Sequence, residues 1–255
     1  MTDSAGAPSI TVSVVSHGHG AMVADLLQDL SACPAVTRIV VTYNIQEPHA
    51  PIPATLQSRT MAIENERPAG FAANHNEAFR RSRTDFFCVV NPDIRLRADP
   101  FGLLLESMKR SGAVLAAPAV LNPAGLVEST ARRFPTPLGL LLKLGGMSDG
   151  GISFRLGGEP LKPDWVAGMF LLIRADAFAS VGGFDELFHL YYEDVDLCAR
   201  LRKAGHELIV CPAVTVVHDA RRASHRQLRF LVWHLKSMMR YFSRHLGRLP
   251  ARRTV

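Results

Sequence analysis

The chain has 255 residues, of which 47% are hydrophobic and 20% charged, so its composition is that of a globular protein with ample core and excludes a disordered chain. The net charge of +6 is uneven: ten Lys and Arg residues and no acidic residue follow Asp219, whereas the first 219 residues hold 19 basic against 23 acidic residues, which is −4. This imbalance disfavours nucleic acid as a partner of the whole chain. We predict a cytoplasmic protein, because the four cysteines form no CxxC pair and the sequence shows no secretory signal and no apolar run of membrane length.

β-Branched runs alternate with helical patterns through the first half of the chain. We expect helices within 21–33, 70–83 and 100–112, and strands within 9–18, 36–44, 58–65, 85–93 and 113–121. This alternation predicts right-handed βαβ units and a mostly parallel sheet. Residues 122–163 are rich in Gly and Pro and predict a long mobile connection.

Polar residues stand at or just after the ends of the predicted strands. Ligands of such sheets bind beyond the carboxyl ends of the strands, which makes these side chains candidates for a binding site. They are Ser16, His17, Asn44, Asn65, Asn91 and Asp93.

The segment LYYEDVDLCARLRKAG, residues 190–205, crowds three carboxylates into the first turn of a predicted helix. The free N–H groups and the dipole of a helix start stabilise negative charge there by about 0.3–1 kcal/mol each, which allows a purely structural role and predicts a lowered pKa for Asp194. In the alternative interpretation, Asp194 or Glu193 is a general base that takes a proton from a hydroxyl nucleophile. Asp196 is assigned to the helix start.

Four motifs, in the same order along the chain, resemble inverting family 2 glycosyltransferases, and the rhamnosyltransferase-like bacterial branch in particular. ENERPAGFAANHNEAF resembles the nucleotide-side loop and helix, and VVNPDI resembles the metal-binding Asp-x-Asp motif with Asn91 at its first position. Residues 166–205, together with Trp165, resemble the acceptor-side segment, and VVHDARRASHR resembles a late histidine followed by a phosphate-binding loop. The resemblance covers about residues 9–246.

The resemblance implies an α/β protein of the A-type glycosyltransferase fold, which is Rossmann-like with a mostly parallel central sheet flanked by helices. We expect residues 1–219 to form the catalytic domain and residues 220–255 a basic amphipathic helix and tail. The implied reaction transfers a sugar, with inversion, from a nucleotide-diphosphate sugar to a hydroxyl of a glycan or lipid-linked acceptor. The branch suggests dTDP-rhamnose as the donor.

The resemblance also implies roles for individual residues. Asp194 is the expected base, with Glu193 as the alternative, and Asp93 and His218 are the expected ligands of Mg²⁺ or Mn²⁺. The acceptor-side residues are Trp165, Gly168 and Tyr192. The donor-side residues are Ser16, His17, Asn44, Asn65, Gly70, Phe71, Asn74, Asn76, Asn91, Asp93 and Arg222.

Two positions depart from the family pattern. Asn91 replaces an acidic residue of the metal motif, and Tyr43 stands where most relatives have an aspartate. These two departures leave open an alternative function, in which the chain is a non-catalytic domain of the same fold that binds nucleotide sugar. Gly70 is expected to let the backbone approach the nucleotide. His19, His75 and His189 receive no role and are expected at the surface.

The basic tail follows a helical pattern from Leu228 onward. Leu231, Leu235, Met238 and Phe242 share one side, and the basic residues lie roughly opposite. We expect the apolar side either to dock on the catalytic domain or to lie on an anionic membrane surface, which would be the inner face of the membrane. The two alternatives are compatible with each other. No aromatic stacking pattern accompanies the basic residues, so we predict no nucleic-acid partner.

Overall fold

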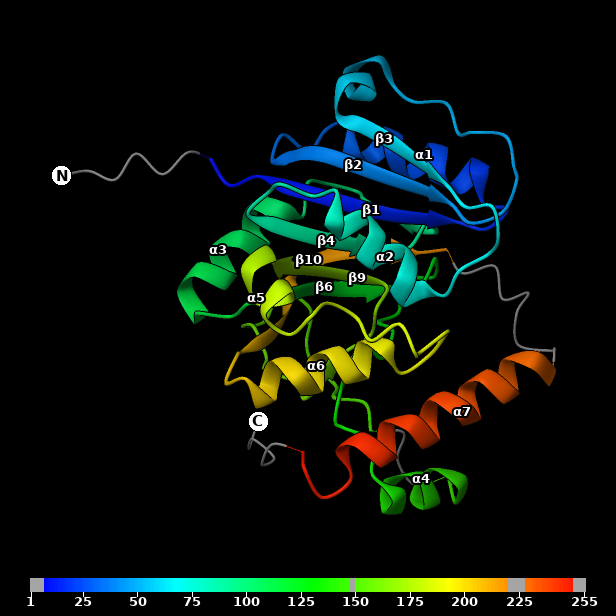
Figure 1. Ribbon diagram of the computed structural model, residues 1–255. Coiled ribbons are helices and arrows are strands. Elements are labelled where there is room, and N and C mark those ends of the chain that lie inside the picture. The colour runs from blue at the N-terminus through cyan, green and yellow to red at the C-terminus, as the bar shows by residue number, and fades with distance from the viewer. Residues whose placement is uncertain (1–6, 147–149, 220–227, 250–255) are drawn as a thin grey trace.

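The computed structural model describes residues 7–146, 150–219 and 228–249. In these residues eight strands form a central sheet in the order β3-β2-β1-β4-β9-β6-β10-β5 (Figure 1). The neighbours β3, β2, β1 and β4 run parallel to one another, and β6 runs parallel to β10. Strand β9 pairs antiparallel with β4 and β6, and β5 pairs antiparallel with β10. The strands are β1 Ile10–Ser16, β2 Val36–Tyr43, β3 Thr60–Glu64, β4 Phe86–Val90, β5 Ile94–Arg95, β6 Leu115–Leu121, β9 Phe170–Arg174 and β10 Leu208–His218.

Helices cover both faces of the sheet, and each face has its own apolar core. One core contains α1 (Gly20–Leu30) and α3 (Phe101–Ser111), and the other contains α2 (Phe71–Arg80), α5 (Ala175–Ser180) and α6 (Glu193–Lys203). A 3₁₀ helix, η1 (Ala54–Arg59), precedes β3. A two-stranded sheet of β7 (Ala131–Arg132) and β8 (Trp165–Val166), together with α4 (Pro137–Leu144), lies within or borders the segment predicted as one long connection.

The alternation of side chains along β1 shows why the sheet is buried on both sides. Val12 and Val14 face the core of α1 and α3. Ser13 points to the other face, where its hydroxyl lies 2.8 Å from His75 Nδ1. The expectation that His75 lies at the surface is therefore wrong: the ring is 1% exposed, and burial lowers its pKa to about 3.

The four neighbouring parallel strands end at one edge of the sheet. Ser16 is the last residue of β1, while Asn44, Asn65 and Asn91 follow β2, β3 and β4 directly. The predicted alignment of polar residues along this edge is thus confirmed. The edge defines where a ligand of the sheet would bind.

Helix α7 (Leu228–His245) packs against the sheet domain through α6. Tyr241 and His245 are its most buried side chains, while Leu231 and Leu235 remain exposed. The docked face therefore includes only part of the predicted apolar side: Met238 and Phe242 pack against the core, whereas Leu231 and Leu235 do not. Polar contacts of Ser237 to the preceding loop and of His245 to α6 accompany this rotated docking. No helix in the described part of the chain is long and apolar enough to cross a membrane.

Candidate active site

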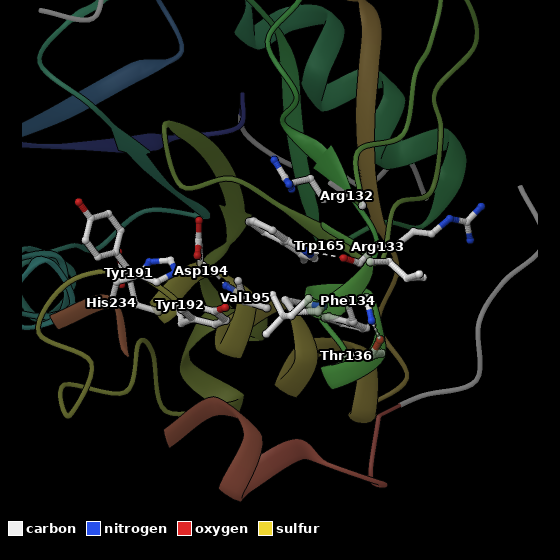
Figure 2. A pocket seen from close by; sticks show the side chains of 16 residues that line it. Arg132, Arg133, Phe134, Thr136, Trp165, Tyr191, Tyr192, Asp194, Val195 and His234 are labelled. Carbon is white, nitrogen blue, oxygen red and sulfur yellow. Dashed lines mark hydrogen bonds between the residues drawn. The ribbon is translucent and has the colours of Figure 1, made fainter. Parts of the chain in front are cut away.

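The carboxylates at the start of α6 border a cavity of about 490 Å³. Aromatic side chains dominate the part of its wall beside Asp194, where Trp165 comes from β8 and Tyr191 and Tyr192 precede α6 (Figure 2). Arg132 of β7 adds a guanidinium whose centre lies 5.5 Å from the ring centre of Trp165. The cavity thus combines a carboxylate with flat apolar surfaces, the combination that a sugar hydroxyl and a sugar ring require.

Backbone geometry fixes the Asp194 side chain. The Gly168 N–H donates to Oδ2 (2.9 Å) and the Val195 N–H donates to Oδ1 (2.8 Å). The turn into α6 uses the left-handed region at two consecutive tyrosines, Tyr191 (φ 69°) and Tyr192 (φ 66°). Side chains other than glycine rarely adopt this conformation, and such strain concentrates at functional sites. This turn begins α6 with the side chains of Glu193 and Asp194 at the cavity.

The two carboxylates at the cavity differ in environment. Glu193 is 6% exposed, and burial, reinforced by the charge of Asp194, raises its pKa well above the ordinary value. Asp194 is half-buried, and burial also raises its pKa, although the Gly168 and Val195 N–H groups and the Arg132 charge oppose the rise. The expectation of a lowered pKa is wrong because burial outweighs the helix start. Burial therefore disfavours the charged form of Glu193 more strongly than that of Asp194, and Asp194 is more basic than an ordinary aspartate.

Asp196 faces away from the cavity. It is fully buried, accepts from Arg200 Nε (2.6 Å) and lies 2.8 Å from His245 Nε2 of α7. Burial alone would raise its pKa, but His245 and Arg200 outweigh burial and lower it. Asp196 thus connects α6 to α7.

The backbone of Gly168 and Met169 contacts both the Asn-Pro-Asp turn and Asp194. The Asn91 N–H donates to the Met169 carbonyl (2.9 Å), and the N–H of the preceding Gly168 holds Asp194. Consecutive Cα atoms are about 3.8 Å apart, so the two motifs share one short turn between β8 and β9. The predicted proximity of the metal-side and acceptor-side motifs therefore has a direct structural basis.

Asp93 and His218 meet beside this turn. Asp93 Oδ2 lies 3.2 Å from His218 Nε2, and Asp93 Oδ1 is buried without a hydrogen-bond partner. On the other side of the ring, Glu128 Oε2 lies 2.9 Å from His218 Nδ1. Burial alone would lower the pKa of His218, but Asp93 and Glu128 outweigh it and raise the pKa to about 9.

These side chains fit a hard divalent cation. An unsatisfied carboxylate oxygen beside an imidazole is a suitable donor pair for Mn²⁺ or Mg²⁺. Within the described residues, no group of three or more His, Cys, Asp or Glu side chains is arranged to hold a metal ion. The Asp93–His218 pair is therefore an incomplete site that oxygens of a bound ligand would have to complete.

Several donor-side residues form one polar cluster at the ends of β2 and β3. Asn44 Oδ1 accepts from Asn65 Nδ2 (2.8 Å) and from the Ala69 N–H (2.8 Å), and Asn65 Nδ2 also donates to Asn74 Oδ1 (2.7 Å). His17 Nδ1 lies 3.2 Å from Asn44 Nδ2. The hydroxyl of Ser16, a buried residue, accepts from a nearby backbone N–H.

Other predicted donor-side residues have structural partners instead. The amide of Asn76 exchanges hydrogen bonds with the backbone of Phe184 (2.9 Å each way) and is not brought to the Asn44 cluster. A Cβ on Gly70 would lie 2.7 Å from the backbone oxygen of His189, so this glycine permits close packing of two chain segments, and its approach to a nucleotide stays a prediction. Phe71 packs edge-on against Phe184. Arg222 lies outside the described residues.

Two charged residues near the site escaped prediction. Arg132 and Glu128 both lie in the weakly patterned segment 122–163, where no periodicity or motif marks them. Tyr43, which departs from the family pattern, is buried: its hydroxyl accepts from the Ala50 N–H (2.9 Å), and its ring stacks on His49 with centroids 4.0 Å apart. It therefore anchors the loop after β2.

Comparison with solved structures defines the class of protein. The chain is similar to GalNAc-T7 with UDP, GalNAc and Mn²⁺ (TM-score 0.69, 13% identity, 92% of this chain, 48% of that chain). It is also similar to the mannosyltransferase PcManGT from Pyrobaculum calidifontis with GDP-Man and Mn²⁺ (TM-score 0.64, 13% identity, 97% of this chain, 67% of that chain). The chain has the A-type glycosyltransferase fold, as the sequence predicts.

Curated relatives narrow the class further, although no protein-family model matches the chain. Rhamnosyltransferase WbbL of Escherichia coli K12 is 28% identical over 92% of this chain and 93% of its own length. N-acetylglucosaminyl-diphospho-decaprenol L-rhamnosyltransferase of Mycobacterium tuberculosis is 34% identical over 67% of this chain, a match that spans 60% of that relative. These homologues indicate a bacterial rhamnosyltransferase-like glycosyltransferase, which confirms the predicted resemblance.

Proposed function

We propose that this glycosyltransferase transfers a sugar, with inversion at the anomeric carbon, from a nucleotide-diphosphate sugar to a hydroxyl of a lipid-linked glycan. Two curated relatives named rhamnosyltransferases support dTDP-rhamnose as the first donor to test. The name of the mycobacterial relative specifies a diphospho-decaprenol acceptor, which supports a lipid-linked one here. Residues 1–219 are the proposed catalytic domain.

The observation that carries this proposal is the Asp194 carboxylate, half-buried and held by two backbone N–H groups in the wall of the cavity. An acceptor hydroxyl in the cavity would donate to this carboxylate, which takes the proton as the oxygen attacks the anomeric carbon. Attack from the side opposite the diphosphate inverts that carbon. Glu193 is the weaker candidate for the base because burial and the Asp194 charge raise its pKa and disfavour its charged form.

The acceptor site of this proposal is the same cavity. Trp165 offers one ring face, and its Nε1–H donates to the Arg133 carbonyl (2.8 Å), which fixes the ring (Figure 2). Gly168 leaves space beside the base, because a Cβ there would lie 3.5 Å from the Asp194 carboxylate. Tyr192 adds a second aromatic wall. Arg132 supplies positive charge for an acceptor diphosphate.

On the donor side, the proposal assigns the cation to Asp93 and His218, with Mn²⁺ or Mg²⁺ as the metal. The cation would neutralise the growing charge of the diphosphate leaving group. The cluster of Asn44, Asn65 and His17 is the proposed contact for the nucleotide. Asn91, which follows β4 at the same edge of the sheet, is a further proposed contact, and Arg222 remains a prediction.

The test combines turnover with product stereochemistry. The protein is incubated with dTDP-rhamnose, Mn²⁺ and a polyprenyl-diphosphate-linked N-acetylglucosamine, and both dTDP release and the anomeric configuration of the product are measured. A panel of nucleotide sugars in a thermal-shift assay identifies the donor, because a ligand of the native state raises the melting temperature. Donor binding without transfer for any acceptor tried would favour the nucleotide-sugar-binding domain, and a retained configuration would exclude the mechanism.

A further inference from the structure

Helix α7 carries an exposed apolar stripe on the side that faces away from the sheet domain. Leu231, Val232, Leu235 and Met239 are 55%, 47%, 46% and 65% exposed. At about 100° per residue these positions span one third of the helix circumference, so they form a continuous strip. Exposed apolar strips of this kind mark surfaces that bind another partner.

Helix α4 extends this apolar surface. Leu138 and Leu142 of α4 are 66% and 38% exposed. Leu142 also lines the cavity that contains Asp194, as does His234 of α7, so both helices border the same cavity. Figure 1 shows α4 and α7 together at one end of the molecule, beyond α6. The two helices that carry the exposed apolar side chains therefore both border the proposed acceptor site.

The charge next to the stripe is positive. Lys236 is exposed and follows Val232 by four positions, which places it at the border of the stripe. Arg248 is exposed just beyond the end of α7. Ten basic residues and no acidic residue follow Asp219 in the sequence. An apolar strip bordered by cations is the pattern of a helix that lies in the plane of an anionic lipid surface.

We propose that the α4–α7 face, defined by the exposed leucines of α4 and the α7 stripe, binds the surface of an anionic phospholipid bilayer. The apolar side chains enter the acyl boundary, and Lys236 and Arg248 contact lipid phosphates. A second copy of the chain fits this face less well, because two such faces would bring their cations together across a two-fold axis. The inference goes beyond sugar transfer: it orients the mouth of the cavity toward the membrane.

Vesicle flotation tests this proposal without any sugar donor. The full chain is mixed with phosphatidylglycerol vesicles or phosphatidylcholine vesicles at low and high salt. We expect binding to phosphatidylglycerol that weakens with salt and is much weaker for phosphatidylcholine. Leu235→Glu should lower the partition coefficient on the order of tenfold or more, since a buried apolar contact is lost and a like charge faces the lipid.

Leu103→Glu is the matched control, because Leu103 on α3 is 52% exposed and lies on a different part of the molecule. It should bind vesicles like the unmodified chain, and circular dichroism checks that both variants are folded. The proposal is overturned if the unmodified chain does not float, or if both leucine variants lose binding equally. It is also overturned if Leu235→Glu changes the molecular mass in solution and leaves flotation unaltered, which assigns the stripe to a second copy. Asp194→Asn should float normally, so failed transfer and failed docking are distinguishable.

Discussion

Replacement of Asp194 by Asn separates the base from the rest of the site. The carboxylate accepts two backbone N–H groups on different oxygens, from Gly168 and from Val195. An amide keeps one acceptor and turns an NH₂ group toward the other N–H, so one charge-assisted hydrogen bond is lost. Such a loss costs about 1.5–3 kcal/mol of stability. At roughly 2–4 °C per kcal/mol, the variant should melt several degrees lower and remain folded at 25 °C.

The effect on catalysis should be much larger than the effect on stability. A positioned general base contributes roughly 10²–10⁴-fold, which corresponds to about 3–5 kcal/mol of the barrier. Glu193→Gln is the control: burial raises the pKa of Glu193 and so favours its neutral form, and its Oε2 has no hydrogen-bond partner, so a neutral amide should replace it with little change. We expect that variant to keep the rate within about tenfold.

Single-turnover transfer and donor affinity are measured for both variants. Asp194→Asn should lose transfer and keep donor affinity. The raised pKa of Asp194 also sets the acid limb of the pH–rate profile: the base is ionised above its folded pKa, so the rate falls as pH drops through a value above the ordinary 3.8. Equal losses in both variants, or equal loss of donor affinity and rate in Asp194→Asn, would refute the assignment of the base.

Three further predictions concern the surroundings of the site. Glu128→Ala should weaken Mn²⁺ binding in the presence of nucleoside diphosphate about 10–100-fold in a calorimetric titration. Glu128→Gln should retain much of the Mn²⁺ affinity, because an amide oxygen still accepts from the His218 imidazole. An equal loss of affinity in both variants would contradict the orientation of His218 by this hydrogen bond. Gly70→Ala should cost about 1–3 kcal/mol in thermal unfolding, because its Cβ would lie 2.7 Å from a backbone oxygen, whereas Gly102→Ala, whose Cβ would meet nothing within 4 Å, should not destabilise. His245→Ala should lower the free energy of unfolding by about 1–3 kcal/mol near neutral pH. Because the folded pKa of Asp196 is lowered, the stability difference between the two proteins is complete above pH 3.8 and disappears as the pH falls through that lowered pKa. A stability difference that does not change with pH would contradict the Asp196–His245 interaction.

The edge of the sheet was predictable because it depends on local patterns. Each of β1 to β4 is a short β-branched or aromatic run followed by a polar residue, and parallel neighbours bring these residues to one edge whatever the strand order. Asn44 and Asn65 therefore meet as expected. The start of α6 was predictable for the same reason, since its carboxylates and its apolar stripe are adjacent in sequence.

Burial was not predictable, because it depends on segments far away in the chain. His75 is enclosed because Ser13, 62 residues earlier, turns a hydroxyl to the same face of the sheet. The expected pKa of Asp194 had the wrong sign because burial raises the pKa more than the Gly168 and Val195 N–H groups and the Arg132 charge lower it. The rotated docking of α7 depends on Asp196, whose partner His245 lies 49 residues later. Periodicity within one element contains no information about such contacts.

Three carboxylates tolerate one helical turn because their surroundings separate their protonation states. Glu193 is buried, and burial together with the Asp194 charge raises its pKa and so favours its neutral form. Asp196 is buried deeper still but keeps its charge, because Arg200 and His245 compensate it. Repulsion at Asp194 is therefore weakened, because burial biases Glu193 toward its neutral form and because the Asp196 charge is compensated by Arg200 and His245. A half-buried aspartate with two backbone donors then retains both a fixed orientation and a raised pKa, the two properties that a base for a sugar hydroxyl needs.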